Sequence, residues 1–185
     1  MDEQQKFFKL LKYSNELKKN KKSLRKKDSE AFNLLLNFSV TIENNLHYLE
    51  KQEYINLAKY FLADQITADD FSYSFMGIYE GISQKLGQMK RTESLELANF
   101  LKPNRPELGY LLARIYGSCD SFSTDPEIAM SDEKELKDCA QILLLKLQEE
   151  DMAAGLAEGM AAGLAIIAAI IILAKTLTDF NPIHM

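Results

Sequence analysis

The feature that most constrains the fold is an uncharged apolar run near the C-terminal end of the chain. Residues 159–174 consist only of Gly, Met, Ala, Leu and Ile. Extended back to Met152, the run includes one charged residue, Glu158, and covers about 23 residues, or about 34 Å of helix. The hydrocarbon core of a bilayer is about 30 Å thick. The sequence therefore predicts one transmembrane helix over residues 151–175, followed by a short tail over 176–185.

The alternative for this run is a central helix buried inside a soluble protein. A small bundle has too few residues to surround a helix that is apolar on all its faces. Most basic residues precede the run and only Lys175 follows it. Because basic segments stay on the cytosolic side, we expect a single-pass tail anchor with the bulk of the chain on the cytosolic or stromal side.

Three glycines in this region recur every four residues, at Gly155, Gly159 and Gly163. This spacing places them on one face of a helix, where small residues let a second transmembrane helix approach closely. The sequence predicts that this face packs on a helix of a membrane complex. The alternative is that these glycines belong to a low-complexity segment and have no role in helix packing.

The N-terminal segment is strongly basic although the whole chain carries a net charge of −5. Residues 1–27 contain ten Lys or Arg and three acidic residues, which gives about +7 there and about −12 elsewhere. Phe7, Leu10, Leu11 and Leu17 follow a helical spacing over about residues 3–26, so residues 1–28 are predicted as a basic amphipathic helical arm. Anionic lipid or an acidic protein suits such an arm. The candidate contact residues are Lys18, Lys19, Lys21, Lys22 and Arg25.

Nucleic acid is not the expected partner of this arm. Proteins that bind single strands interleave basic residues with aromatic side chains that stack on bases, and the segment from Lys18 to Lys27 has none.

Residues 29–150 are predicted to form a small helical bundle, which makes the chain all-α. Helical stripes of apolar residues run over 30–49, 54–62, 71–89, 108–122 and 136–147. Thr67 stands three residues before Asp70, as in a capping box, and Ser131 is the expected cap of the last helix of the bundle. No alternating strand pattern competes with these helices.

The residue inventory argues against an enzyme. Only two histidines occur, His47 and His184, and the chain lacks the HExxH, GxSxG, phosphate-loop and CxxC motifs. Cys119 and Cys139 are predicted to be small buried helix residues in a reducing compartment. We therefore expect no catalytic residue, no metal, no cofactor and no small-molecule substrate.

Three segments resemble the bacterial self-protective colicin-D-type immunity domain. They are Phe61–Phe71, Ile115–Ile128 and the start of the last bundle helix at Asp132–Leu136. The similarity covers about residues 50–148. It implies a small helical bundle that binds and blocks a tRNA-cleaving toxin through an acidic surface. The positions that match this surface are Asp69, Asp70, Asp120, Asp125 and Glu127, although the same carboxylates suit helix caps and turns.

Two functions follow as expectations. The first is a tail-anchored adaptor or accessory subunit that binds proteins and attaches a soluble assembly to a membrane complex. The chain is rich in Lys, Asn, Ile, Phe and Tyr, and the domain that it resembles is also expected in plastid-encoded proteins of red-lineage algae. These two associations suggest a photosynthetic complex of the thylakoid membrane. The alternative is an immunity protein that neutralises a tRNA-cleaving bacteriocin nuclease.

Overall fold

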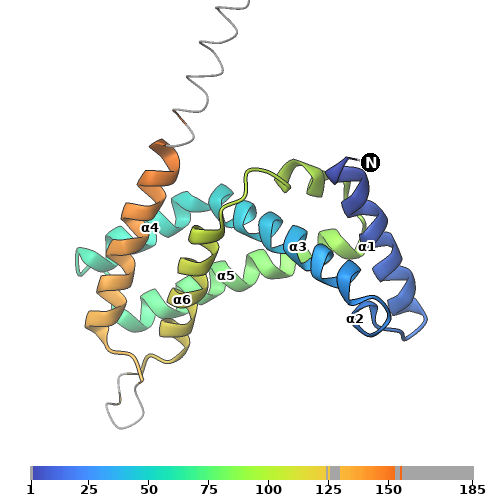
Figure 1. Ribbon diagram of the computed structural model, residues 1–185. Coiled ribbons are helices and arrows are strands. Elements are labelled where there is room, and N and C mark those ends of the chain that lie inside the picture. Colours follow the sequence, from blue (N-terminus) through green and yellow to red (C-terminus); the bar gives the residue numbers. More distant parts are fainter. Residues whose placement is uncertain (1, 124, 126–129, 153–154, 156–185) are drawn as a thin grey trace, which may run out of the picture. The chain divides into compact units, whose positions relative to one another are not determined.

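A computed structural model describes residues 2–123, 125, 130–152 and 155 of the chain. The described residues up to Leu147 form one compact unit, and a second unit begins at Gln148. All regular elements in the described part are helices, which confirms the all-α bundle (Figure 1). Within the same residues, no helix is both long and apolar enough to cross a bilayer. The apolar run at 159–174, including Gly159 and Gly163, lies outside the described residues, and Gly155 is an exposed helical residue.

The helices of the first unit follow one another with short connections. They are α1 (Glu3–Lys19), α2 (Leu24–Lys27), α3 (Ser29–Leu49), α4 (Lys51–Leu62), α5 (Ala68–Arg91), the 3₁₀ helix η1 (Leu95–Phe100) and α6 (Pro106–Asp120). A further helical segment begins at residue 133 and continues through residue 152. We refer to its part within the first unit, residues 133–147, as the last bundle helix.

The helix expected over residues 3–26 forms as two pieces, α1 and α2. Asn20 ends α1, and Lys21 next to it has a φ of 54°, a left-handed conformation that cannot continue a helix. Four lysines between Lys18 and Lys22 repel one another, which disfavours helix at this point. Both pieces still bury their apolar faces in the first unit, through Phe7, Leu11, Leu17 and Leu24.

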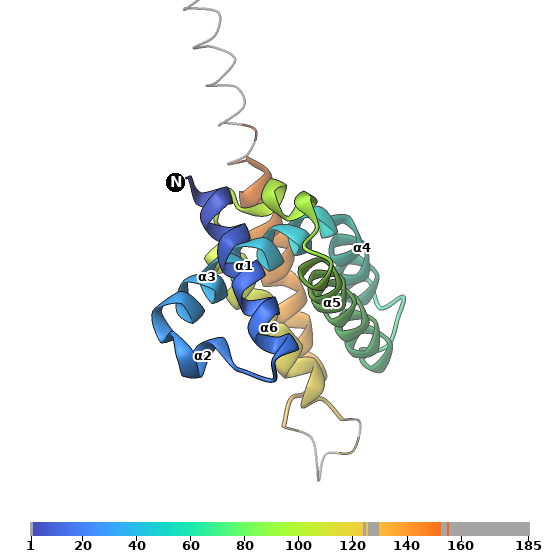
Figure 2. The same ribbon diagram turned by 90° about the vertical axis from the view of Figure 1, so that its right-hand side faces the viewer.

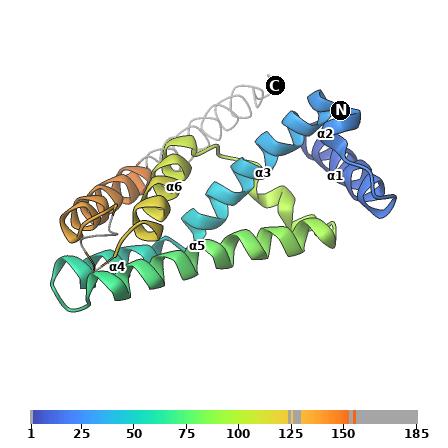
Figure 3. The same cartoon turned by 90° about the horizontal axis from the view of Figure 1, so that it is seen from below.

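Helix α3 is the central element of the bundle. It contacts α1, α2, α4, α5, α6 and η1, and Figure 3 shows it running from α1 and α2 at one end towards α4 at the other. Ile42 and Leu46 are fully buried on it, and Phe38 packs edge-on against the Phe7 ring, with centroids 5.6 Å apart. The basic N-terminal helix is thereby joined to the core through aromatic contacts.

Helix α5 is the longest of the helices from α1 to α6, and it confirms the predicted stripe. Phe71, Phe75, Ile82 and Leu86 are buried along it, and α4 lies beside it (Figure 2). Its start is the predicted capping box, because the Thr67 hydroxyl accepts from the Asp70 N–H and the Asp70 carboxylate accepts from the Thr67 N–H. These bonds satisfy amide groups that a helix otherwise leaves unpaired at its N-terminus.

Two details differ from expectation. The loop after α5 contains η1, whose short 3₁₀ turns have no distinctive periodicity in sequence. Asp132, rather than Ser131, caps the last bundle helix, since its carboxylate accepts from the Glu135 N–H at 2.8 Å. Ser131 is buried instead, and its hydroxyl lies 3.0 Å from that of Ser121.

Candidate functional site

Carboxylates gather where α5 begins and α6 ends. Asp69 and Asp70 occupy the first turn of α5, Asp120 is the final residue of α6, and all three are exposed. The two helices pack together, and the buried Ser72 on α5 lies close to the buried Cys119 on α6. Ser72 is one helical turn after Asp69, and Cys119 directly precedes Asp120, so these acidic residues lie at the same end of the bundle.

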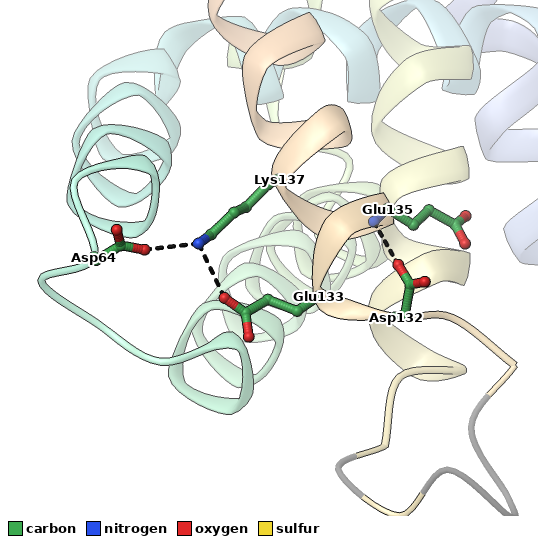
Figure 4. Close-up of polar contacts among 5 residues, drawn as sticks. All are labelled: Asp64, Asp132, Glu133, Glu135 and Lys137. Carbon is green, nitrogen blue, oxygen red and sulfur yellow. Dashed lines mark hydrogen bonds and ion pairs between the residues drawn. The ribbon is translucent and has the colours of Figure 1, made fainter.

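The last bundle helix brings further carboxylates to this end. Lys137 Nζ lies 2.7 Å from Asp64, in the α4–α5 loop, and 3.0 Å from Glu133 (Figure 4). Asp64, followed by Glu133, raises the pKa of Lys137, so this ammonium stays charged. We call the set of Asp64, Asp69, Asp70, Asp120, Asp132 and Glu133 the acidic end.

Several acidic-end residues have structural tasks. The hydrogen bonds from Thr67 lower the pKa of Asp70, so this carboxylate is ionised as it caps α5. Asp132 caps the last bundle helix and Asp64 holds Lys137. Asp69 and Asp120 are different, because neither makes a hydrogen bond or ion pair through its side chain within the part of the chain described. Their charges are available to another molecule.

The other predicted acidic positions lie in the segment between α6 and the last bundle helix. Asp125 is exposed, and its backbone N–H donates to the Ser123 hydroxyl at 3.1 Å, so the side chain that supports this turn is that of Ser123. Glu127 lies outside the described residues. Sequence reasoning missed Asp64. Its φ is 55°, and the only signal in the sequence was an Asp just after the helical stripe over 54–62, since Asp tolerates the left-handed region better than most residues.

The predicted basic residues lie near the opposite end of α5, and only some of them line a cavity there. Lys18, Lys22 and Arg25 line one cavity together with Lys90 and Arg91 from the last turn of α5. Lys19 and Lys21 are exposed and do not line it. Sequence reasoning missed Lys90 and Arg91, because nothing local to α5 shows that its end lies beside α1.

The two charged groups therefore belong to separate sites. Helix α5 has 24 residues, with Asp69 and Asp70 in its first turn and Lys90 and Arg91 in its last. A helix of that length spans about 36 Å. One small ligand cannot reach both groups, whereas two different partners can each use one.

The titratable groups inside the bundle are unsuited to acid–base or nucleophilic work at neutral pH. Burial lowers the pKa of His47 to about 4 and raises the pKa of Cys119 to about 12. Burial also raises the pKa of the Cys139 thiol. Both thiols are free and buried, as predicted, and they remain protonated. Among the described residues, no three His, Cys, Asp or Glu side chains are grouped to hold a metal ion.

Comparison of this chain with known proteins identifies no relative. No protein-family model, no curated protein and no solved structure matches this chain. The resemblance of residues 50–148 to an immunity domain therefore stays a prediction.

Proposed function

We propose that this protein is a non-enzymatic, membrane-tethered adaptor that binds a basic surface of a soluble protein through its acidic end. The observation that carries the proposal is the pair of exposed, unpartnered carboxylates Asp69 and Asp120 on two packed helices. Charges held on rigid elements keep a fixed spacing, which favours a specific partner over diffuse attraction. Lys137 is already neutralised by Asp64 and Glu133, so the acidic end keeps its negative sign.

The tether in this proposal is the apolar run at 159–174. Its length and lack of charge suit a bilayer, with the bundle on the cytosolic or stromal side, and the composition suggests the thylakoid. The glycines at 155, 159 and 163 would pack on a helix of a membrane complex. Gly159→Leu is then expected to release the protein from that complex while leaving it in the membrane fraction. Unchanged association after this substitution would remove the helix-docking part of the proposal.

A charge-reversal experiment tests the acidic end. The full chain carrying Asp69→Lys and Asp120→Lys is purified after mild cross-linking, and its soluble partners are quantified by mass spectrometry against the unchanged protein. The matched control is Glu30→Lys with Glu96→Lys, since both glutamates are exposed and lie on α3 and η1. We expect the first pair to lose the soluble partner and the control to keep it. Equal recovery from both would contradict a role for the acidic end.

The second candidate function is neutralisation of a tRNA-cleaving nuclease. The same acidic end supports it, because a nuclease that grips RNA phosphates presents a basic surface. The test is a titration of a colicin-D-type tRNase with the chain lacking residues 152–185. A tight one-to-one complex that abolishes tRNA cleavage would favour the immunity function. Unimpaired cleavage would favour the adaptor function.

A further inference from the structure

A cavity of about 560 Å³ opens between α1, α2, α3 and α5, away from the acidic end. Its volume lies in the range of about 300–1,000 Å³ that is typical of small-molecule sites. Seventeen residues line it, and none of them is Asp or Glu. The charged side chains that line this open cavity are therefore all cationic.

One side of the cavity is apolar. Leu11, Leu24, Leu35 and Leu86 contribute to it from four different helices, and each is buried in the core of the bundle. Leu36 continues this surface outwards and is 47% exposed. An exposed leucine next to buried ones is a surface that an alkyl chain can cover.

The other side carries five cations: Lys18, Lys22, Arg25, Lys90 and Arg91. Within the part of the chain that the structure describes, none of the five forms an ion pair. Arg25 lies over the Phe32 ring at 6.0 Å, which fixes its charge beside the apolar side. An anionic group bound in the cavity would balance the charge of these five cations.

Lys90 is the most constrained of these cations. Its ammonium is half-buried and donates to the Ser39 hydroxyl at 2.8 Å. Burial, followed by the charge of Lys18, lowers its pKa. Glu43 is close enough to act on it, but the Glu43 carboxylate accepts a hydrogen bond from Ser83. A half-buried ammonium beside a second cation gains most from an anion placed in the cavity.

We propose that this cavity binds a single-chain amphiphile with an anionic head group, of the long-chain fatty carboxylate type. The head group contacts the cations around Lys90 and the alkyl chain covers Leu11, Leu35 and Leu86. A peptide helix suits the space less well, because a helix with its side chains is about 10–12 Å across and needs an extended groove. The inference goes beyond the proposed function, since it uses no residue of the acidic end.

Photo-cross-linking on the full chain tests this proposal. The protein is reconstituted in phosphatidylcholine vesicles and irradiated with a diazirine-bearing hexadecanoate, and the labelled peptides are identified by mass spectrometry. We expect labels in residues 11–36 and 83–91. The methyl ester of the same probe should label these peptides about tenfold less, because it lacks the charge that the cations recognise.

Substitutions of the cavity cations give the second readout. Lys90→Met should reduce labelling about tenfold. The double variant Lys22→Gln with Arg91→Gln should have the same effect, and because both positions are exposed it leaves the core intact. The control is Lys85→Met on the same helix, because Lys85 pairs with Glu50 at 3.5 Å and does not line the cavity.

Three results would overturn the proposal. They are equal labelling by acid and ester, labelling that survives both sets of cation substitutions, and a signal that requires phosphatidylglycerol in the vesicles. The last result would show that the cations face a membrane surface instead.

Discussion

His47 Nδ1 lies 2.8 Å from the Tyr54 hydroxyl, and this buried contact joins α3 to α4. His47 is 2% exposed and Tyr54 is 1% exposed. The Tyr79 ring covers the imidazole with centroids 4.7 Å apart. The other ring nitrogen, Nε2, is buried and has no hydrogen-bond partner among the described residues. No carboxylate in the described part of the chain bonds to this imidazole, so the fold favours its neutral form.

The first prediction is that acid destabilises the bundle through His47. Burial holds the folded pKa at about 4, below the ordinary value of 6.5. The unfolded chain therefore binds the proton more tightly, and stability present above pH 6.5 is lost as the pH falls towards 4. The loss approaches about 3 kcal/mol.

Urea titrations followed by circular dichroism at pH 7 and pH 4.5 measure this loss. His47→Asn is the control, because its amide can still bond Tyr54 but does not titrate. We expect the variant to lose distinctly less stability between the two pH values. An equal loss in both proteins would assign the acid sensitivity to carboxylates such as Asp70 and Glu107, whose pKa values hydrogen bonds lower.

The second prediction contrasts two glycines of α6. A Cβ at Gly109 would overlap the Asn44 side chain, which is buried and donates to the Arg105 carbonyl at 3.1 Å. Gly109→Ala should therefore cost about 1–3 kcal/mol in the free energy of unfolding. At Gly117 nothing lies within 4 Å of an added Cβ, so Gly117→Ala should stabilise the helix by about 0.5–1 kcal/mol. Thermal melts of both variants check this, and shifts of the same sign would contradict the packing of Asn44 on α6.

The third prediction concerns Asn45. Its amide nitrogen donates to the carbonyls of Phe100 at 2.8 Å and Pro103 at 2.7 Å, and its oxygen accepts from Arg105 at 2.7 Å. Asn45→Ala removes these three hydrogen bonds. We expect the free energy of unfolding to fall by about 2–4 kcal/mol.

The matched control is Asn37→Ala, an exposed position on the same helix α3. We expect this change to leave the urea midpoint nearly unaltered, within about 0.5 kcal/mol. Comparable losses at the two positions would mean that Asn45 does not hold the connection between η1 and α6.

The sequence was sufficient for most helices because their signals are local. The Thr67–Asp70 capping box and the apolar stripe from Phe71 to Leu86 each lie within one helix, and the structure has both. The start of α6 at Pro106 is equally local, since proline is pre-organised for the first helical turn.

The sites were less predictable because they are built from distant segments. Lys90 and Lys18 are 72 positions apart, and only the packing of the bundle brings them to one cavity. Asp64 and Lys137 are separated by 73 positions, and no local pattern in either segment indicates their contact. The same limit applies to Asn45, whose partners on η1 and α6 follow from the tertiary fold.

The most direct test of the account is extraction of membranes from the native host with alkaline carbonate. The full-length protein is predicted to remain in the pellet, because the run from Gly159 to Ala174 suits the bilayer. A variant with Ile167→Lys and Ile170→Lys should move to the supernatant, since charges at the bilayer centre are costly. Release of the unchanged full-length protein by carbonate would contradict membrane tethering.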